Sequence, residues 1–223
     1  ELGRTAHPLA HSSPAELKFV IDAAAPFPEL EWAQQVADFP LAEFARTVAM
    51  VAYRRDRAAN ENAVWPGRTY RLHEILADPE QMRFWSTPPH ADLQRTRAWL
   101  ESMIAARAEG RSVDDCIVEF EGRVVGKAGF WREPELGFIF HRRVQGLGIA
   151  AEALEALLAR AFELRGLARV TADVDPRNER CLRLLARLGL RETGRRARTF
   201  CIAGVWSDSV DLELTAQAWR ATR

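Results

Sequence analysis

The 223-residue sequence predicts an α+β protein built on a largely antiparallel sheet. Two observations lead to this fold class. Three strand-like runs follow one another between residues 115 and 141, and alternating helical and strand patterns come after them. The resulting order, β-β-β-α-β-α-β, gives antiparallel neighbours at the start and one parallel crossover around the longest of the later helices.

The strand predictions rest on period-two patterns and turn residues. DCIVEFEGRVVGKAGFW, residues 115–131, contains two strand-like runs joined at Glu121-Gly122, a pair typical of a tight hairpin turn. The remaining runs are ELGFIFH at residues 135–141, LARVTADVD at residues 167–175 and SDSVDLELTA at residues 207–216. These runs are short enough for strands and are bounded by Gly, Pro or charged residues.

The helix predictions rest on apolar residues that recur at spacings of three and four. Residues 150–162 show this pattern most clearly, and Gly166 ends it. NERCLRLLARLG, residues 178–189, places leucines on one face and arginines on the other. Two earlier helical stretches are predicted at residues 70–85, interrupted at Asp78-Pro79, and at residues 92–110, with Leu93, Thr96, Ala98, Leu100 and Met103 facing inward.

Residues 1–65 read differently and predict a mostly helical N-terminal extension, with the main domain at residues 66–223. Four prolines divide this segment. Its clearest helical pattern follows Pro40, where Leu41, Phe44, Val48 and Val51 recur at helical spacing.

Composition and charge exclude several classes of protein. The net charge is zero, which gives no general attraction to nucleic acid or to acidic lipid, and no apolar run is long enough for a membrane span. The three cysteines are far apart and form no CxxC pair, which argues against a disulfide framework and against a zinc site. We therefore expect a cytoplasmic protein without a metal. The arginine-rich C-terminal half fits either a phosphate-bearing ligand or an ordinary solvated surface.

A glycine loop precedes the longest helical pattern, with Gly146 and Gly148 at its start. A helix start carries unpaired amide donors and a positive dipole end, and glycine lets an anion approach them closely. A P-loop would need a lysine and a hydroxyl where Ile149 and Ala150 stand, and a Rossmann turn would need a third glycine. A phosphate cradle and a plain tight turn both remain open at this point.

The loop sequence, Gln145-Gly146-Leu147-Gly148-Ile149-Ala150, matches the pattern QxxGxA and resembles the acetyl-coenzyme A loop of the GNAT N-acetyltransferase superfamily. VDPRNERCLRLLARLGLRETG resembles the next block of that family, AGVWSDSVDLELTAQAW its closing strand, and LADPEQMRFWSTPP an early helix and loop. The resemblance is to the branch typified by the RimJ and RimL ribosomal-protein acetyltransferases. It covers residues 70–219.

The resemblance implies a mixed sheet that is splayed between its fourth and fifth strands, with acetyl-coenzyme A in the opening. Residues 135–141 would be the fourth strand and residues 169–175 the fifth. Amides from Gln145 to Ala151 would hold the pyrophosphate, and backbone near Phe140 to Arg143 would pair with the pantetheine. The implied cofactor contacts are Phe140, His141, Arg142, Arg143, Gln145, Gly146, Leu147, Gly148, Ile149, Ala150 and Asn178.

The resemblance also implies an amine acceptor and a group that removes its proton. Glu135 stands where the branch tends to carry a glutamate, and we expect it to act as the base or to position a water. Glu119, Asp173 and His141 are weaker candidates. Many members use a tyrosine as acid where this chain has Leu185. The thiol of Cys181 is the substitute we expect, although a buried filler is the alternative.

The acceptor side is the least defined part of the prediction. Trp85 and Ser86 lie in the loop that would border the acceptor, which the resemblance implies to be a small molecule or a peptide with a primary amine. The usual first strand of the branch is not visible, and ELKFVI at residues 16–21 is the only candidate. The expected activity is N-acetyl transfer, and a non-catalytic acyl-coenzyme A sensor is the alternative. A homodimer is left open, and neither nucleic acid nor membrane is expected as a partner.

Overall fold

The computed structural model describes residues 48–52, 65–111, 114–120 and 123–221. Its centre is a seven-stranded sheet with the spatial order β1-β2-β3-β4-β5-β7-β6. The strands are β1 (Val48–Ala52), β2 (Asp115–Phe120), β3 (Arg123–Arg132), β4 (Glu135–Phe140), β5 (Arg169–Val174), β6 (Arg191–Ile202) and β7 (Val205–Thr215). All neighbouring pairs are antiparallel except β4 and β5, which confirms the predicted α+β class with one parallel crossover.

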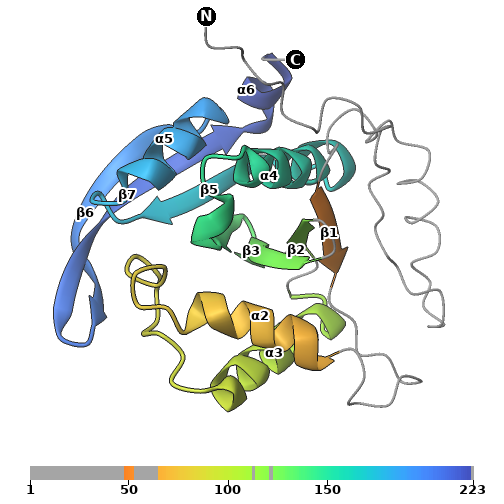
Figure 1. The fold of residues 1–223 in the computed structure, drawn as a ribbon. Helices are drawn as coiled ribbons and strands as arrows, with labels where there is room; N and C mark the ends of the chain where they lie inside the picture. The colour runs from red at the N-terminus through yellow and green to blue at the C-terminus, as the bar shows by residue number, and fades with distance from the viewer. Residues whose placement is uncertain (1–47, 53–64, 112–113, 121–122, 222–223) are drawn as a thin grey trace, which may run out of the picture.

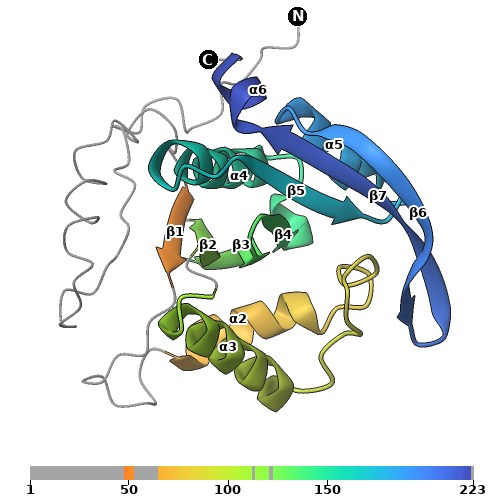
Figure 2. The ribbon, with the colours of Figure 1, turned by 180° about the vertical axis from the view of Figure 1, so that it is seen from behind.

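Helices cover the two faces of this sheet, as Figures 1 and 2 show. The helices are α2 (Trp65–Leu76), α3 (Leu93–Ala108), α4 (Ile149–Ala159), α5 (Glu179–Arg187) and α6 (Ala216–Ala221). α2 and α3 lie against one face of the β1–β4 half, and α4 lies on the opposite face. A π-helical turn, Arg160–Leu164, continues α4 before Gly166 ends it in a left-handed conformation.

Strand alternation divides the buried apolar residues between these two layers. Ile117, Val124 and Ile139 pack with α2 and α3 in one cluster. Val118, Phe130 and Leu136, among others, pack with α4 and α5 in a larger one. Successive side chains of a strand point to opposite faces, so each central strand contributes to both clusters. The central strands are therefore covered on both faces, so a site has to form where strands end or separate.

The sheet opens between β4 and β5. These parallel strands share one register pair, Glu135 with Thr171, and the Thr171 amide donates to the carbonyl of Pro134 at 3.0 Å. On its other edge, β5 pairs with β7 through six register pairs, from Arg169 to Val174. The expected splay between the fourth and fifth strands is thereby confirmed.

Two strands were not predicted correctly. Val48–Ala52 was expected to be helical but forms β1, which pairs with β2 at the edge of the sheet. A short apolar run fits helical and strand spacing alike, and here the edge pairing decides. Arg191–Ile202 was not assigned, yet it forms β6. Its side chains are almost all exposed or half-buried, so an edge strand here lacks the apolar alternation that would indicate it.

Smaller differences concern single residues. Ala98 was expected to face inward on α3 but is exposed, whereas Thr96, Leu100 and Met103 are buried as expected. The hairpin turn at Glu121-Gly122 and the candidate strand at residues 16–21 lie outside the described residues. The domain boundary at residue 65 stays a prediction, although β1 shows that the sheet takes a strand from the N-terminal side of that boundary.

Candidate active site

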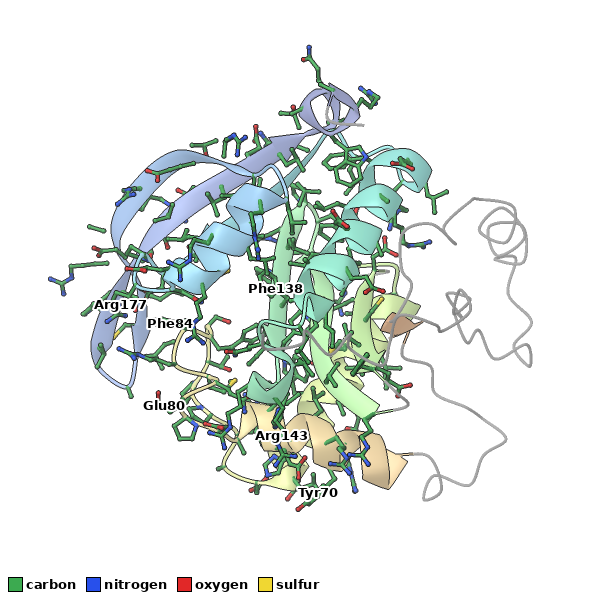
Figure 3. The ribbon with its side chains drawn as sticks, turned by 45° about the horizontal axis from the view of Figure 1, so that its top comes forward. Tyr70, Glu80, Phe84, Phe138, Arg143 and Arg177 are labelled. Atoms are coloured by element: carbon green, nitrogen blue, oxygen red, sulfur yellow. The ribbon has the colours of Figure 1, made fainter. Side chains whose placement is uncertain are left out.

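A cleft of about 540 Å³ lies at the opening between β4 and β5. Its walls come from the α2–α3 loop, α3, strands β2 to β5, the start of α5 and the β6–β7 hairpin. Figure 3 shows Phe84 of the α2–α3 loop between Phe138 of β4 and Arg177, which precedes α5. Because β4 and β5 diverge here, side chains from distant parts of the sequence meet around one space.

The glycine loop, residues 145–148, directly precedes α4 in the chain. Gly146 and Gly148 have φ angles of +83° and +84°, a left-handed conformation that favours glycine. A Cβ atom on either would have no described heavy atom within 4 Å, so the space beside them is open. The two glycines are therefore required by backbone conformation, and they leave the start of α4 accessible.

The amides at this helix start are only partly available. The first helical hydrogen bond runs from the Glu152 amide to the Gly148 carbonyl at 3.0 Å, so the amides of residues 149–151 precede the hydrogen-bonded ladder. The amides of Gln145 and Leu147, however, already donate to Arg142 and Val144 within the loop. Of the expected set from Gln145 to Ala151, the amides of Gly146, Gly148 and residues 149–151 therefore remain as candidates.

The stretch expected to pair with a pantetheine is also partly occupied. The Arg142 amide donates to Oε1 of Gln81 at 2.8 Å, and the Arg143 amide donates to Nδ1 of His141 at 3.1 Å. Burial lowers the pKa of His141, and the neighbouring Arg143 guanidinium lowers it further. Phe140 is buried in the core. His141 is therefore a neutral loop-ordering residue in this structure.

Cationic side chains surround the loop. Arg142 and Arg143 are exposed, and Arg180 of α5 donates to Oε1 of Gln145 at 2.9 Å. The Leu147 side chain is 60% exposed, whereas Ile149 is buried and anchors the helix. This arrangement presents positive charge around amide donors, which is the chemistry that a phosphate group requires.

α5 starts at the cleft, and its start is set by Asn178. The Asn178 side chain accepts from the Cys181 amide at 3.3 Å and caps the helix. Cys181 and the fully buried Leu185 line the cleft from this helix. Burial raises the pKa of the Cys181 thiol to about 12, so this group remains protonated at neutral pH.

Glu135 is the first residue of β4 and lines the cleft at the point where the strands separate. Its side chain is 30% exposed, and its nearest cation is Arg132, with 3.9 Å between Nη2 and Oε2. The contact is loose and the Arg132 side chain is 72% exposed. The Glu135 carboxylate is thus positioned in the cleft with little to restrain it.

The predicted acceptor residues Trp85 and Ser86 both line the cleft. Beneath Trp85 lies an ion pair that was not predicted. Nζ of Lys127 is 2.5 Å from Oδ1 of Asp115, both side chains are almost completely buried, and the lysine lies 5.9 Å from the Trp85 ring centroid. A charged residue within the apolar strand β3 was the sequence signal for this pair.

Two more carboxylates line the cleft, Asp173 in β5 and Asp175 directly after that strand. Oδ2 of Asp173 accepts from Nη2 of Arg196 at 2.7 Å, and Arg196 also donates to both carboxylate oxygens of Asp211. Asp175 accepts from Arg177 through side chain and backbone. Although burial opposes it, these bonds hold the pKa of Asp175 below its usual value. Arg196 belongs to the unpredicted strand β6, so this network was not visible in the sequence.

The described residues also bear on metal binding and on membrane insertion. Among the parts of the chain that the structure describes, no group of His, Cys, Asp and Glu side chains is arranged to hold a metal ion. Over the same residues, no helix has the length and apolar character to cross a membrane.

Comparisons with known proteins show the family to which this chain is similar. Residues 69–191 match the acetyltransferase (GNAT) domain family. An uncharacterised N-acetyltransferase of Bacillus licheniformis, p20, is 27% identical over 130 residues, which are 55% of this chain and 73% of that protein. The [ribosomal protein uS5]-alanine N-acetyltransferase of Escherichia coli (strain K12) is 34% identical over 88 residues, which are 40% of this chain and 45% of that enzyme.

Solved structures show the same fold at lower identity. RimL, a ribosomal L7/L12 alpha-N-protein acetyltransferase in complex with coenzyme A, superposes with a TM-score of 0.67 at 15% identity and covers 78% of this chain and 97% of its own. The spermidine N-acetyltransferase from Vibrio cholerae, in complex with CoA and spermine, has a TM-score of 0.64 at 16% identity and covers 78% and 98%.

Proposed function

Because the chain belongs to the GNAT acetyltransferase family, we propose that it transfers an acetyl group from acetyl-coenzyme A to a primary amine by direct attack in a ternary complex. The observation that carries this proposal is the sheet opening. One register pair joins β4 to β5, and the cleft lies where the two strands diverge. α5 lines this cleft and contacts the glycine loop through the hydrogen bond from Arg180 to Gln145.

The glycine loop fits the phosphate part of the cofactor. Open space beside Gly146 and Gly148 leaves room for an anion, and the amides at the start of α4 would donate to it. Arg142, Arg143 and Arg180 would add positive charge around it. When bound, acetyl-coenzyme A would supply the thioester from which the acetyl group is transferred.

Glu135 is the group that we assign to proton removal. An amine attacks only as the neutral base, so a proton has to leave its nitrogen before or during attack. The Glu135 carboxylate lines the cleft, and among the described residues its ion pair is the loose one with Arg132 at 3.9 Å. It would accept the proton directly or through one water.

Cys181 is assigned a different part of the reaction. A thiol with a pKa of about 12 is a weak acid, and a thiol of ordinary acidity has a pKa near 8.5. Complete proton transfer from Cys181 to a departing thiolate is therefore unfavourable. Hydrogen bonding to that sulfur is the role its burial allows, with Asn178 fixing the backbone that carries it.

The acceptor class rests on the relatives. The Escherichia coli relative is named for the alanine of a ribosomal protein, and the Vibrio cholerae structure contains spermine. A peptide N-terminus, an antibiotic or a small metabolite is accordingly the acceptor we propose, with the primary amine as the common element. Trp85 and Ser86 would border it.

A non-catalytic acyl-coenzyme A sensor is the second candidate, and one observation favours it. Leu185, fully buried beside the cleft, stands where many family members carry a tyrosine acid. A sensor would bind the cofactor through the same loop and would need neither Glu135 nor an acceptor.

Two finer parts of the proposal concern the setting of the protein. Cys181 and Cys201 form no disulfide among the residues that the structure describes, which suits a reducing compartment, and we propose that the protein is cytoplasmic. A homodimer is the oligomeric form we propose to test by light scattering.

The deciding experiment measures thiol release from acetyl-coenzyme A with a panel of amines, for the wild-type chain and Glu135→Gln. We expect turnover with at least one primary amine and a loss of roughly 10²- to 10⁴-fold in kcat for the variant. The neighbouring Glu133→Gln is the control, because Glu133 pairs with Arg165 instead. Cofactor binding without turnover on any amine would instead favour the sensor.

A further inference from the structure

We propose that Asp173 of β5 binds the acceptor's primary amine and holds its nitrogen across the opening from Glu135, with Arg196 and Asp211 fixing the orientation of the Asp173 carboxylate. This inference rests on the proposed function and assigns a positioning residue to the same site. It gives the two carboxylates separate tasks, since Asp173 anchors the nitrogen and Glu135 removes its proton.

The register of the sheet places Asp173 on the same face as Glu135. Glu135 is opposite Thr171, and paired residues of neighbouring strands present their side chains on the same face. Asp173 is two residues further along β5 and therefore shares that face. Because β4 and β5 have no register pair beyond Thr171, Asp173 forms a wall of the opening, and it lines the same cleft as Glu135.

The two oxygens of Asp173 are in different situations. Oδ2 accepts from Nη2 of Arg196 at 2.7 Å. Oδ1 is buried and has no hydrogen-bond partner among the residues that the structure describes. A buried carboxylate oxygen without a donor is unfavourable, and such groups often mark a place where a ligand or water supplies the donor. An amine N–H is the donor that the proposed reaction brings to this point.

A fixed support holds this carboxylate in place. Asp173 and Asp211 are a register pair of β5 and β7, and Arg196 of β6 bridges them. Its Nε and Nη2 lie 2.8 and 2.6 Å from the Asp211 oxygens. The hydrogen bond to Asp211 raises the pKa of Arg196, so the bridge stays charged. The hydrogen bond at Oδ2 fixes the rotation of the Asp173 carboxylate and leaves Oδ1 as the oxygen that can accept from the amine.

Asp175 provides an internal comparison. It lies two residues further on, lines the same cleft and is also a carboxylate. Both of its oxygens accept from the Arg177 side chain, at 2.9 and 2.6 Å, and one also accepts from the Arg177 amide. Asp175 is thus satisfied within the protein. Of these two carboxylates, Asp173 is the one with an oxygen that lacks a donor among the described residues.

The test uses Asp173→Asn in the full chain, with the amine that gives the best turnover in the panel. We expect KM for the amine to rise by roughly 10- to 100-fold, the loss of one charge-assisted hydrogen bond, while the acetyl-coenzyme A Kd changes less than about 2-fold. The acidic limb of the kcat profile should persist, since Glu135 is unchanged. Asp211→Asn should raise KM by a smaller factor.

Glu192→Gln is the matched control, because Glu192 also pairs with an arginine on β6 but does not line the cleft, and KM should not change. An unchanged KM in Asp173→Asn overturns the inference. So does a lower kcat with the acidic limb lost, because Asp173 would then be the base. Absence of turnover by the wild-type chain on every amine contradicts the proposed function itself, a result distinct from these two.

Discussion

The proposed cofactor side and the proposed acceptor side differ in the groups that form them, which are backbone amides on the first and side chains on the second. On the cofactor side, the amide donors that we propose lie within one continuous stretch, residues 146–151. On the acceptor side, side chains from the α2–α3 loop, several strands and the β6–β7 hairpin converge. A site formed by the backbone of one short segment produces a recognisable pattern in the sequence of that segment. A site formed by side chains from several elements depends on strand register, which produces almost no local sequence pattern.

This difference makes the acceptor side the more sensitive to single changes in side-chain charge. Lys127→Met should destabilise the fold by about 3–5 kcal/mol, because it leaves Asp115 charged and buried without its partner. Urea unfolding followed by tryptophan fluorescence would measure this loss. Adding Asp115→Asn to the same chain should recover much of it, since the uncompensated charge is then absent. A loss below about 1 kcal/mol in Lys127→Met would show that the pair is hydrated.

On the cofactor side, backbone conformation should matter more than side-chain identity. Gly148→Glu should weaken acetyl-coenzyme A binding by roughly 100-fold, measured by calorimetry, because it strains a left-handed residue and brings a negative charge to the anion site.

Gly166→Glu is the matched control for that variant. Gly166 is also left-handed, with φ +64°, and also has open space at its Cβ position, but it follows the far end of the helix. Its Kd for acetyl-coenzyme A should stay within about 2-fold of wild type, since only the strain is shared. Equal weakening by both variants would mean that the loop is not the phosphate site.

The smallest effect is expected where the two sides meet, at Cys181. Cys181→Ala should lower kcat by roughly 10-fold or less, because it removes one neutral hydrogen bond to the departing sulfur. Cys181→Ser should retain more activity, because its hydroxyl can still donate. With a pKa of about 12, the thiol stays protonated below that pH, so the basic limb of the wild-type profile between pH 6 and 10 should persist in Cys181→Ala.

Alkylation gives an independent check of that thiol. Iodoacetamide at pH 8 should label the exposed Cys201 and leave Cys181 unmodified, because the thiolate is the reactive form. Rapid labelling of Cys181, read by mass spectrometry of tryptic peptides, would contradict its protonated state.

The comparison of the two sides also explains which elements could be predicted from the sequence. The strands β2 to β5, the helix α4 and the cap at Asn178 were read from period, turn and capping residues that lie close together in sequence. The splay itself came from the family resemblance, since no local pattern shows where two parallel strands part.

The missed elements share a different physical origin. β1 is an apolar run of five residues that fits a helix and a strand equally, and β6 is an exposed edge strand rich in arginine. Without β6 in the prediction, Arg196 had no place beside Asp173. The pair of Lys127 and Asp115 depends on the register of β2 against β3, which spacing within either strand does not determine.

The β6–β7 hairpin extends past the body of the sheet toward the α2–α3 loop, as Figure 1 shows. Phe200 lines the cleft from this hairpin and is 38% exposed, and Val205 and Trp206 at its end are 59% and 48% exposed. Substitutions at such positions remove little packing and cost the fold little. Changes on this hairpin can therefore reshape one wall of the cleft at little cost to the fold, whereas Gly146 and Gly148 are held by their left-handed backbone.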